Sequence, residues 1–101
     1  MPSLHLDNNH LKVVKEILKQ HLKHCEVLAY GSRVAGNHHS ASDLDLCIIN
    51  QQNPQTATAN IAAIRADLRA SNLPITVDIV DFAKIPEHFQ QEIMAYHIKI
   101  F

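Results

Sequence analysis

The chain contains only two glycines, Gly31 and Gly36, and they lie five positions apart in a sequence of 101 residues. Every other turn must be made without glycine, so this stretch is expected to need unusual backbone angles or a close backbone approach. An apolar run over residues 25–30 ends at Gly31 and is predicted to form a buried strand. Residues 31–42 are then expected to form a polar turn, with one helical turn after Ser32.

Hydrophobic periodicity predicts the remaining elements. They are a helix over 7–24 capped by Asp7 or Asn8, a strand over 43–49, a helix over 56–70, a strand over 75–80, and a helix opening at Pro86 with Phe89, Ile93 and Tyr96 inward. The tail, residues 97–101, fits either more helix or a short fourth strand. This order predicts an α+β fold, a small mixed β-sheet with helices packed against it.

Composition limits the class of protein. Hydrophobic residues make up 47% and charged residues 19%, so we expect residues 1–101 to form a single domain. A net charge of −1 argues against long nucleic acids and anionic membranes as primary partners. No apolar run approaches a membrane span, the N-terminus lacks the features of a signal peptide, and two cysteines do not make a disulfide scaffold. A reduced, cytoplasmic protein is expected.

Two aspartates carry the main chemical signal. Asp43 and Asp45 lie two residues apart on a predicted strand, so both side chains leave the same face, while Leu44 and Leu46 fix the register from the opposite face. Like charges this close repel unless a cation is shared, and Mg²⁺ accepts carboxylate oxygens together with substrate phosphates.

Asp78 is the candidate for a third carboxylate, because a lone charge in the apolar strand 75–80 is costly unless it is paired or metal-bound. Asp81 is a weaker candidate and fits better as a cap of the next turn. Gly31 and Ser32 mark the change from strand to turn, where backbone N–H groups suit a triphosphate, and Arg33 could add a phosphate contact. Singly, each motif has an ordinary structural explanation; their combination favours a functional site.

The histidines and cysteines give weaker signals. His38 and His39 are expected in an exposed loop, with the alternative that one touches a substrate phosphate. His21 and Cys25 could share a helix face, but a zinc site needs three or four ligands and is disfavoured. Cys25 and Cys47 are expected to be small buried hydrophobes.

Gly31-Ser32, followed after ten residues by Asp43-Leu44-Asp45, resembles the signature of the DNA polymerase β-type nucleotidyltransferase superfamily. The segments around these motifs are similar to its minimal nucleotidyltransferase (MNT) branch, which includes the antitoxins of HEPN/MNT toxin–antitoxin pairs. Asp78 matches the family's third carboxylate. The resemblance covers nearly the whole chain and implies a nucleotidyltransferase fold.

This resemblance also implies a mechanism. Asp43, Asp45 and Asp78 would be catalytic and would hold Mg²⁺ against ATP, with Asp78 completing the metal site or accepting the proton of the attacking hydroxyl. Gly31, Ser32 and Arg33 would bind the nucleotide. AMP would pass to a tyrosine of a HEPN toxin encoded next door, which would silence its RNase activity.

Two other functions stay open. The chain could neutralise its partner by contact alone, as a non-catalytic binding module, or it could modify a small molecule such as an aminoglycoside. The second domain that larger relatives use for substrate binding is missing, which argues against a small molecule and predicts that a partner chain supplies part of the site. The tail residues Ile98, Ile100 and Phe101 could make that contact or pack on the domain's own core.

Overall fold

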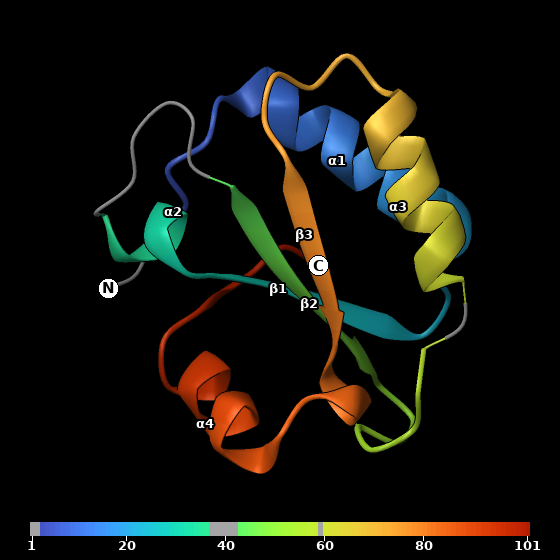
Figure 1. Cartoon of the computed structure of the whole chain (residues 1–101), viewed down its shortest axis with the longest axis vertical. Coiled ribbons are helices and arrows are strands. Elements are labelled where there is room, and N and C mark those ends of the chain that lie inside the picture. Colours follow the sequence, from blue (N-terminus) through green and yellow to red (C-terminus); the bar gives the residue numbers. More distant parts are fainter. Residues whose placement is uncertain (1–2, 37–42, 59) are drawn as a thin grey trace.

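The computed structural model describes residues 3–36, 43–58 and 60–101. Its centre is a four-stranded sheet in the order β3-β2-β1-β4 (Figure 1). The strands are β1 (Cys25–Tyr30), β2 (Leu44–Asn50), β3 (Val77–Asp81) and β4 (Ile98–Lys99). β1 pairs antiparallel with β2 and β4, whereas β2 pairs parallel with β3. The mixed sheet expected from the sequence is therefore confirmed, and β3 is one of its edges.

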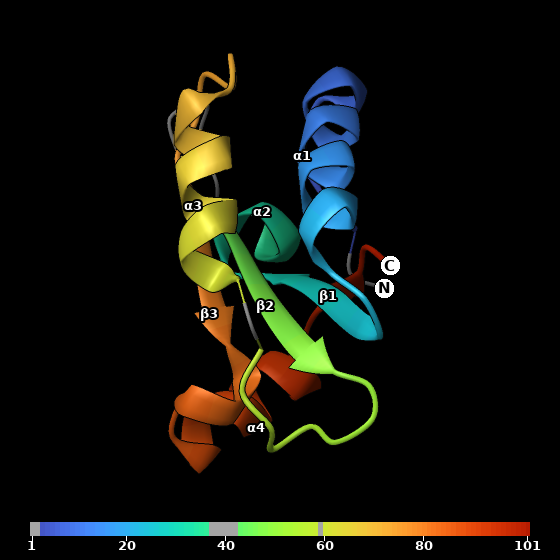
Figure 2. The ribbon, with the colours of Figure 1, turned by 90° about the vertical axis from the view of Figure 1, so that its right-hand side faces the viewer.

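Helices cover both faces of the sheet. They are α1 (Asn8–His21), α2 (Ser32–Ala35), α3 (Ile61–Ala70) and α4 (Glu87–Ala95), with a 3₁₀ turn, η1, at Phe82–Lys84. Figure 2 shows α1 and α3 side by side at one end of the molecule and α4 at the other. Within the described ranges, no helix is both long enough and apolar enough to cross a membrane.

The alternation of β2 divides the core. Leu44, Leu46 and Ile48 are fully buried in the cluster that packs on α1 and α3. Cys47 and Ile49 point the other way and pack with residues of η1 and α4. The face assignment predicted for this strand is confirmed, and it places Asp45 on the α4 face.

The chain before α3 departs from the prediction. The helix begins at Ile61 rather than at residue 56, after Asn60 with a positive φ of 69°. The backbone N–H of Thr58 donates to Oδ2 of Asp81 at 2.7 Å, which holds this segment against β3 instead of in a helical turn. The first helix likewise ends at His21, before His24 with a φ of 55°.

The two ends of the chain also settle open points. Asp7 caps α1 by accepting from the N–H of Asn9 at 2.8 Å. The tail forms the short strand β4, and Val27 exchanges backbone hydrogen bonds with Ile100 and Phe101 on the far side of β1. Ile98, Ile100 and Phe101 pack on the domain's own core.

Tyr96, expected to face inward, is 49% exposed because α4 ends one residue earlier.

Candidate functional site

The register of the sheet brings two of the three aspartates together. Asp45 lies opposite Tyr30 of β1 on one side and opposite Asp78 of β3 on the other. Adjacent strands lie about 4.8 Å apart, so the Asp45 and Asp78 side chains leave neighbouring backbone positions on the same face. Asp43 stands immediately before β2 and is exposed.

The electrostatics of Asp45 reflect this crowding. Burial, followed by the charges of Asp78 and Asp43, raises its pKa from 3.8 to about 6. The part of this shift that comes from the neighbouring carboxylates favours a cation at this place. Over residues 3–36, 43–58 and 60–101, however, no three acidic, histidine or cysteine side chains already converge on one metal-binding point.

Gly31 lies directly against Asp45. It has a φ of 81°, and a Cβ added there would overlap Oδ2 of Asp45 and lie 3.2 Å from its Cγ. The close backbone approach expected of this glycine is therefore an approach to the carboxylate itself. Ser32 follows as the first residue of α2, so the Gly31-Ser32 turn and Asp45 share one corner of the site.

Arg33 is buried, unlike Gly31 and Ser32 next to it in the sequence. Its side chain is buried, and its Nη1 donates to the carbonyl oxygen of His5 at 2.8 Å. The N–H of His5 returns a hydrogen bond of 2.8 Å to the Arg33 carbonyl, which ties the N-terminal segment to α2. A phosphate contact from Arg33 stays a prediction.

Asp81 acts as a cap. Its carboxylate is buried and accepts from the N–H of Ala83 at 3.3 Å as well as from Thr58. Burial, and then the charge of Asp81, raises the pKa of the Cys47 thiol to about 12, so this cysteine is a neutral core residue. The expected capping role of Asp81 is therefore confirmed, and Asp78 as the third site carboxylate stays a prediction.

His21 and Cys25, which gave weaker signals in the sequence, contact residues outside the candidate site. His21 pairs with Asp67 of α3 at 2.5 Å, and the Cys25 thiol donates to the carbonyl oxygen of Lys23 at 3.4 Å. His38 and His39 lie outside the described residues.

A cleft of about 480 Å³ opens beside Gly31 and Ser32. Tyr30 forms its floor and meets Phe89 of α4 edge-to-face, with ring centroids 5.7 Å apart. Burial, and then the charge of Asp45, raises the pKa of the Tyr30 hydroxyl, so it is a neutral phenol at pH 7.

The cleft is also lined by Glu92 of α4 and by Tyr96, which directly follows this helix. Glu92 was not among the predicted site residues, and Tyr96 was predicted to face the core. The spacing of Phe89, Glu92, Ile93 and Tyr96 at intervals of three or four does place them along one side of a helix. Nothing in that spacing indicates that this side faces the Gly31-Ser32 turn, because that depends on how η1 and α4 fold back over the sheet.

Comparisons with known proteins bear on the family and the fold. The family described as polymerase beta, nucleotidyltransferase matches residues 12–101. A protein of Haemophilus influenzae named "Probable protein adenylyltransferase MntA" is 35% identical over 97 residues, covering 96% of this chain and 83% of that relative. A crystal structure described as a toxin–antitoxin with AMP-PNP superimposes with a TM-score of 0.72 at 21% identity, over 90% of this chain and 72% of that one. At that identity, the likeness concerns the fold.

Proposed function

Because the chain belongs to the polymerase β nucleotidyltransferase family, we propose that it transfers AMP from ATP to a hydroxyl of a partner protein. The partner is a HEPN-domain toxin encoded by a neighbouring gene, the acceptor is a tyrosine, and the modification makes this chain the antitoxin. One observation carries the proposal: Asp45 lies between Tyr30 and Asp78 in the sheet register, with Gly31 packed against its carboxylate.

ATP occupies the β1 side of this arrangement. The Gly31-Ser32 turn holds the phosphates, because backbone and hydroxyl donors at the end of a strand suit anionic oxygens. The nucleoside enters the adjoining cleft between α2 and α4, where Tyr30 and Tyr96 offer aromatic surface. This placement leaves the Asp78 side of the site open to the acceptor.

Asp43, Asp45 and Asp78 fit a magnesium ion. All three are oxygen donors. The charges of Asp78 and Asp43, which add to the effect of burial in raising the pKa of Asp45, would be neutralised by a divalent cation. When bound, Mg²⁺ supplies charge neutralisation for the triphosphate and for the pyrophosphate that leaves.

The chain's own residues orient the reactants. Asp78, at the β3 edge, holds the acceptor hydroxyl and takes its proton. The acceptor oxygen forms a bond to the α-phosphorus of ATP, the bond from that phosphorus to its bridging oxygen breaks, and pyrophosphate leaves. Gly31 and Ser32 keep the departing phosphates in line with the attack, so positioning accounts for most of the catalysis.

The comparisons support the protein acceptor. The Haemophilus relative is named as a protein adenylyltransferase, and the solved structure of similar fold is described as a toxin–antitoxin.

The decisive test is the intact mass of the HEPN protein encoded next door, purified after co-expression with this chain. We expect masses increased by one or more AMP groups with the unmodified chain and none with the Asp43→Asn/Asp45→Asn variant. Glu16→Gln, which removes an exposed charge from α1, serves as the control and should modify the partner normally. Co-purification of an unmodified partner with both the unmodified chain and the double variant would instead show neutralisation by contact alone.

A further inference from the structure

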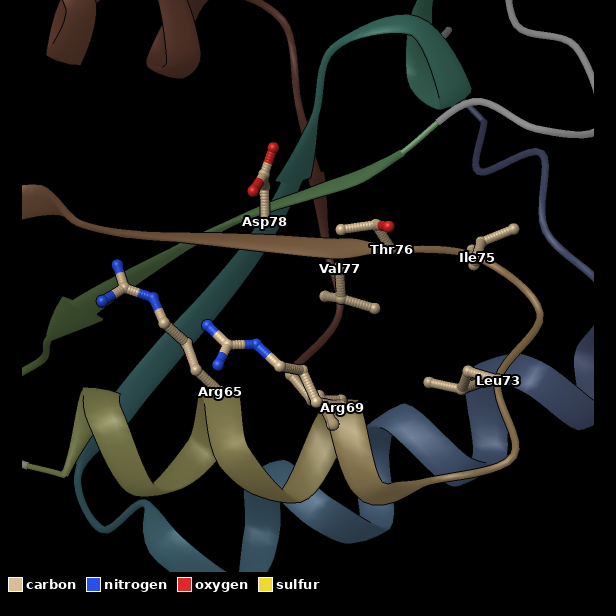
Figure 3. Close-up of a pocket in the computed structure, with 8 residues that line it drawn as sticks. Arg65, Arg69, Leu73, Ile75, Thr76, Val77 and Asp78 are labelled. Atoms are coloured by element: carbon tan, nitrogen blue, oxygen red, sulfur yellow. The ribbon is translucent and has the colours of Figure 1, made fainter.

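A basic groove runs between α3 and the edge strand β3, beside the candidate site. It encloses about 330 Å³. Two arginines, Arg65 and Arg69, project from successive turns of α3 into this space, and Figure 3 shows both guanidinium groups extending toward β3. Its apolar lining is contributed by Leu68, Leu73, Ile75 and Val77. We call this feature the Arg65–Arg69 groove.

The positive charge of the groove is uncompensated. Nη2 of Arg65 donates to the carbonyl oxygen of Ile79 at 2.9 Å, which fixes the guanidinium against the outer side of β3. Arg69 makes no hydrogen bond or ion pair with any residue that the structure describes, and both arginines are exposed. Asp78 lines the same space through its place in β3, but its carboxylate lies on the other side of the strand from the arginines (Figure 3).

The groove lies at the edge of the sheet from which an acceptor would reach Asp78. The sheet order puts the Gly31-Ser32 turn at β1 and Asp78 at β3, with β2 between them. A nucleotide on the β1 side is therefore approached from the β3 edge, beyond which no strand of the described residues lies. Any protein segment that brings a hydroxyl to Asp78 across that edge passes the Arg65–Arg69 groove.

We propose that the Arg65–Arg69 groove docks an acidic segment of the acceptor protein, whose carboxylates pair with the two arginines while its hydroxyl reaches Asp78. This inference rests on the proposed function and adds the chemistry of the partner's docking segment. Guanidinium groups bind carboxylates through paired hydrogen bonds. The apolar lining suits the aliphatic parts of a peptide.

A protein segment fits this groove better than RNA. Single-stranded RNA is generally bound by aromatic side chains on which its bases stack, and the groove lining contains no aromatic residue among the described positions. Two arginines on a chain of net charge −1 also give a weak field for a polyanion.

The test uses Arg69→Glu, since this side chain makes no bond within the described part of the fold that the substitution could break. The probe is the neighbouring-gene HEPN protein, with initial rates of AMP transfer measured against its concentration and against that of ATP. We expect the KM for the protein to rise about tenfold, as a loss of roughly 1.4 kcal/mol in docking would produce, while the KM for ATP and the kcat at saturation stay within about twofold. Arg69→Lys should restore most of the loss.

Lys12→Glu, an equal charge reversal on an exposed position of α1, is the matched control and should leave all three constants unchanged. If the unmodified chain transfers AMP but Arg69→Glu leaves the KM for the protein unchanged, the docking proposal is wrong and the proposed function stands. If the unmodified chain transfers no AMP, the proposed function fails. The groove is then tested by the dissociation constant of the same complex, and equal values for the unmodified chain and Arg69→Glu would overturn it.

A fluorescein-labelled RNA 12-mer tests whether the Arg65–Arg69 groove binds RNA instead of a protein segment. Binding to the unmodified chain that Arg69→Glu abolishes, with the KM for the protein unchanged, would assign the groove to RNA and refute protein docking. No binding of the 12-mer by either chain, together with the tenfold rise in KM, is the result expected here.

Discussion

The Cα of Gly31 lies against the Asp45 carboxylate, and a methyl group has no room between them. Its backbone, with a φ of 81° and a ψ of −156°, is in a region that essentially only glycine adopts. We expect Gly31→Ala to lower the free energy of unfolding by about 1–3 kcal/mol. We also expect roughly 100-fold slower AMP transfer, because the carboxylate must move. Chemical denaturation and the rate of partner modification measure the two effects.

Gly36→Ala is the control that introduces backbone strain without displacing the Asp45 carboxylate. Gly36 also has a positive φ, 92°, but among the described residues a Cβ there meets only Nε2 of His5, at 3.9 Å. This variant should lose about 1–2 kcal/mol of stability and keep its transfer rate within a few-fold. Equal losses of activity in the two variants would mean that contact with Asp45 is not what makes Gly31 necessary.

Asp45 itself gives a pH-dependent prediction. Its pKa is raised from 3.8 to about 6 in the folded chain, so the native state binds this proton more tightly than the unfolded chain does. The resulting stabilisation is complete below pH 3.8 and is lost as the pH rises through 6. In EDTA, Asp45→Asn should therefore raise the free energy of unfolding at pH 7 by about 1 kcal/mol, after allowance for solvent screening.

The advantage of Asp45→Asn should shrink toward zero at pH 4, where the aspartate is protonated and neutral like asparagine. Melting temperatures at pH 7 and pH 4 measure this difference, and about 1 kcal/mol corresponds to roughly 4–8 °C in a domain of this size. Glu16→Gln is the control for removing an exposed negative charge. A stabilisation by Asp45→Asn that is the same at both pH values would contradict the raised pKa of this carboxylate.

At the scale of elements, α4 lines the cleft beside Gly31 and Ser32. Gln90 attaches this helix to η1 by donating from Nε2 to the carbonyl oxygen of Phe82 at 2.6 Å. Tyr96 and Met94 near its end are exposed to nearly the same extent, 49% and 48%, yet only Tyr96 lines the cleft. We expect Tyr96→Ala to weaken binding of Mg–AMP-PNP roughly five- to tenfold through lost aromatic contact, and Met94→Ala to leave it unchanged. Isothermal titration measures both.

Features that depend on residues close together in the sequence could be predicted, whereas features that depend on distant residues could not. The bounds of β1 and the two faces of β2 follow from alternation and from Gly31, which are properties of short segments. The start of α3 does not, because the contact of Thr58 with Asp81 joins positions 23 residues apart. For the same reason the register of Asp45 against Asp78 was not predicted, because Asp78 was chosen as a lone charge in an apolar strand and through the family resemblance. The walls supplied by α3 and α4 were not predicted either.

At the scale of the whole molecule, the sheet order allows two ligands to reach the site aspartates from opposite sides. The β1 side carries the Gly31-Ser32 turn and its cleft, and the β3 side carries Asp78 and the Arg65–Arg69 groove. A nucleotide should therefore bind without the partner, and it should do so through the aspartates. Its binding would then stabilise the isolated chain, because a ligand that binds only the folded state raises the free energy of unfolding.

We expect Mg–AMP-PNP at 100 times its dissociation constant to stabilise the isolated chain by about 2.7 kcal/mol. EDTA should remove most of this gain, since the triphosphate would then face the uncompensated charges of Asp43, Asp45 and Asp78. Asp43→Asn/Asp45→Asn should show little response to magnesium, and Arg69→Glu should respond like the unmodified chain because its groove lies on the acceptor side. Thermal unfolding with and without each component measures all four cases. A loss of the nucleotide response in Arg69→Glu would mean that the two approaches are not separate, and that the nucleotide extends to the β3 edge.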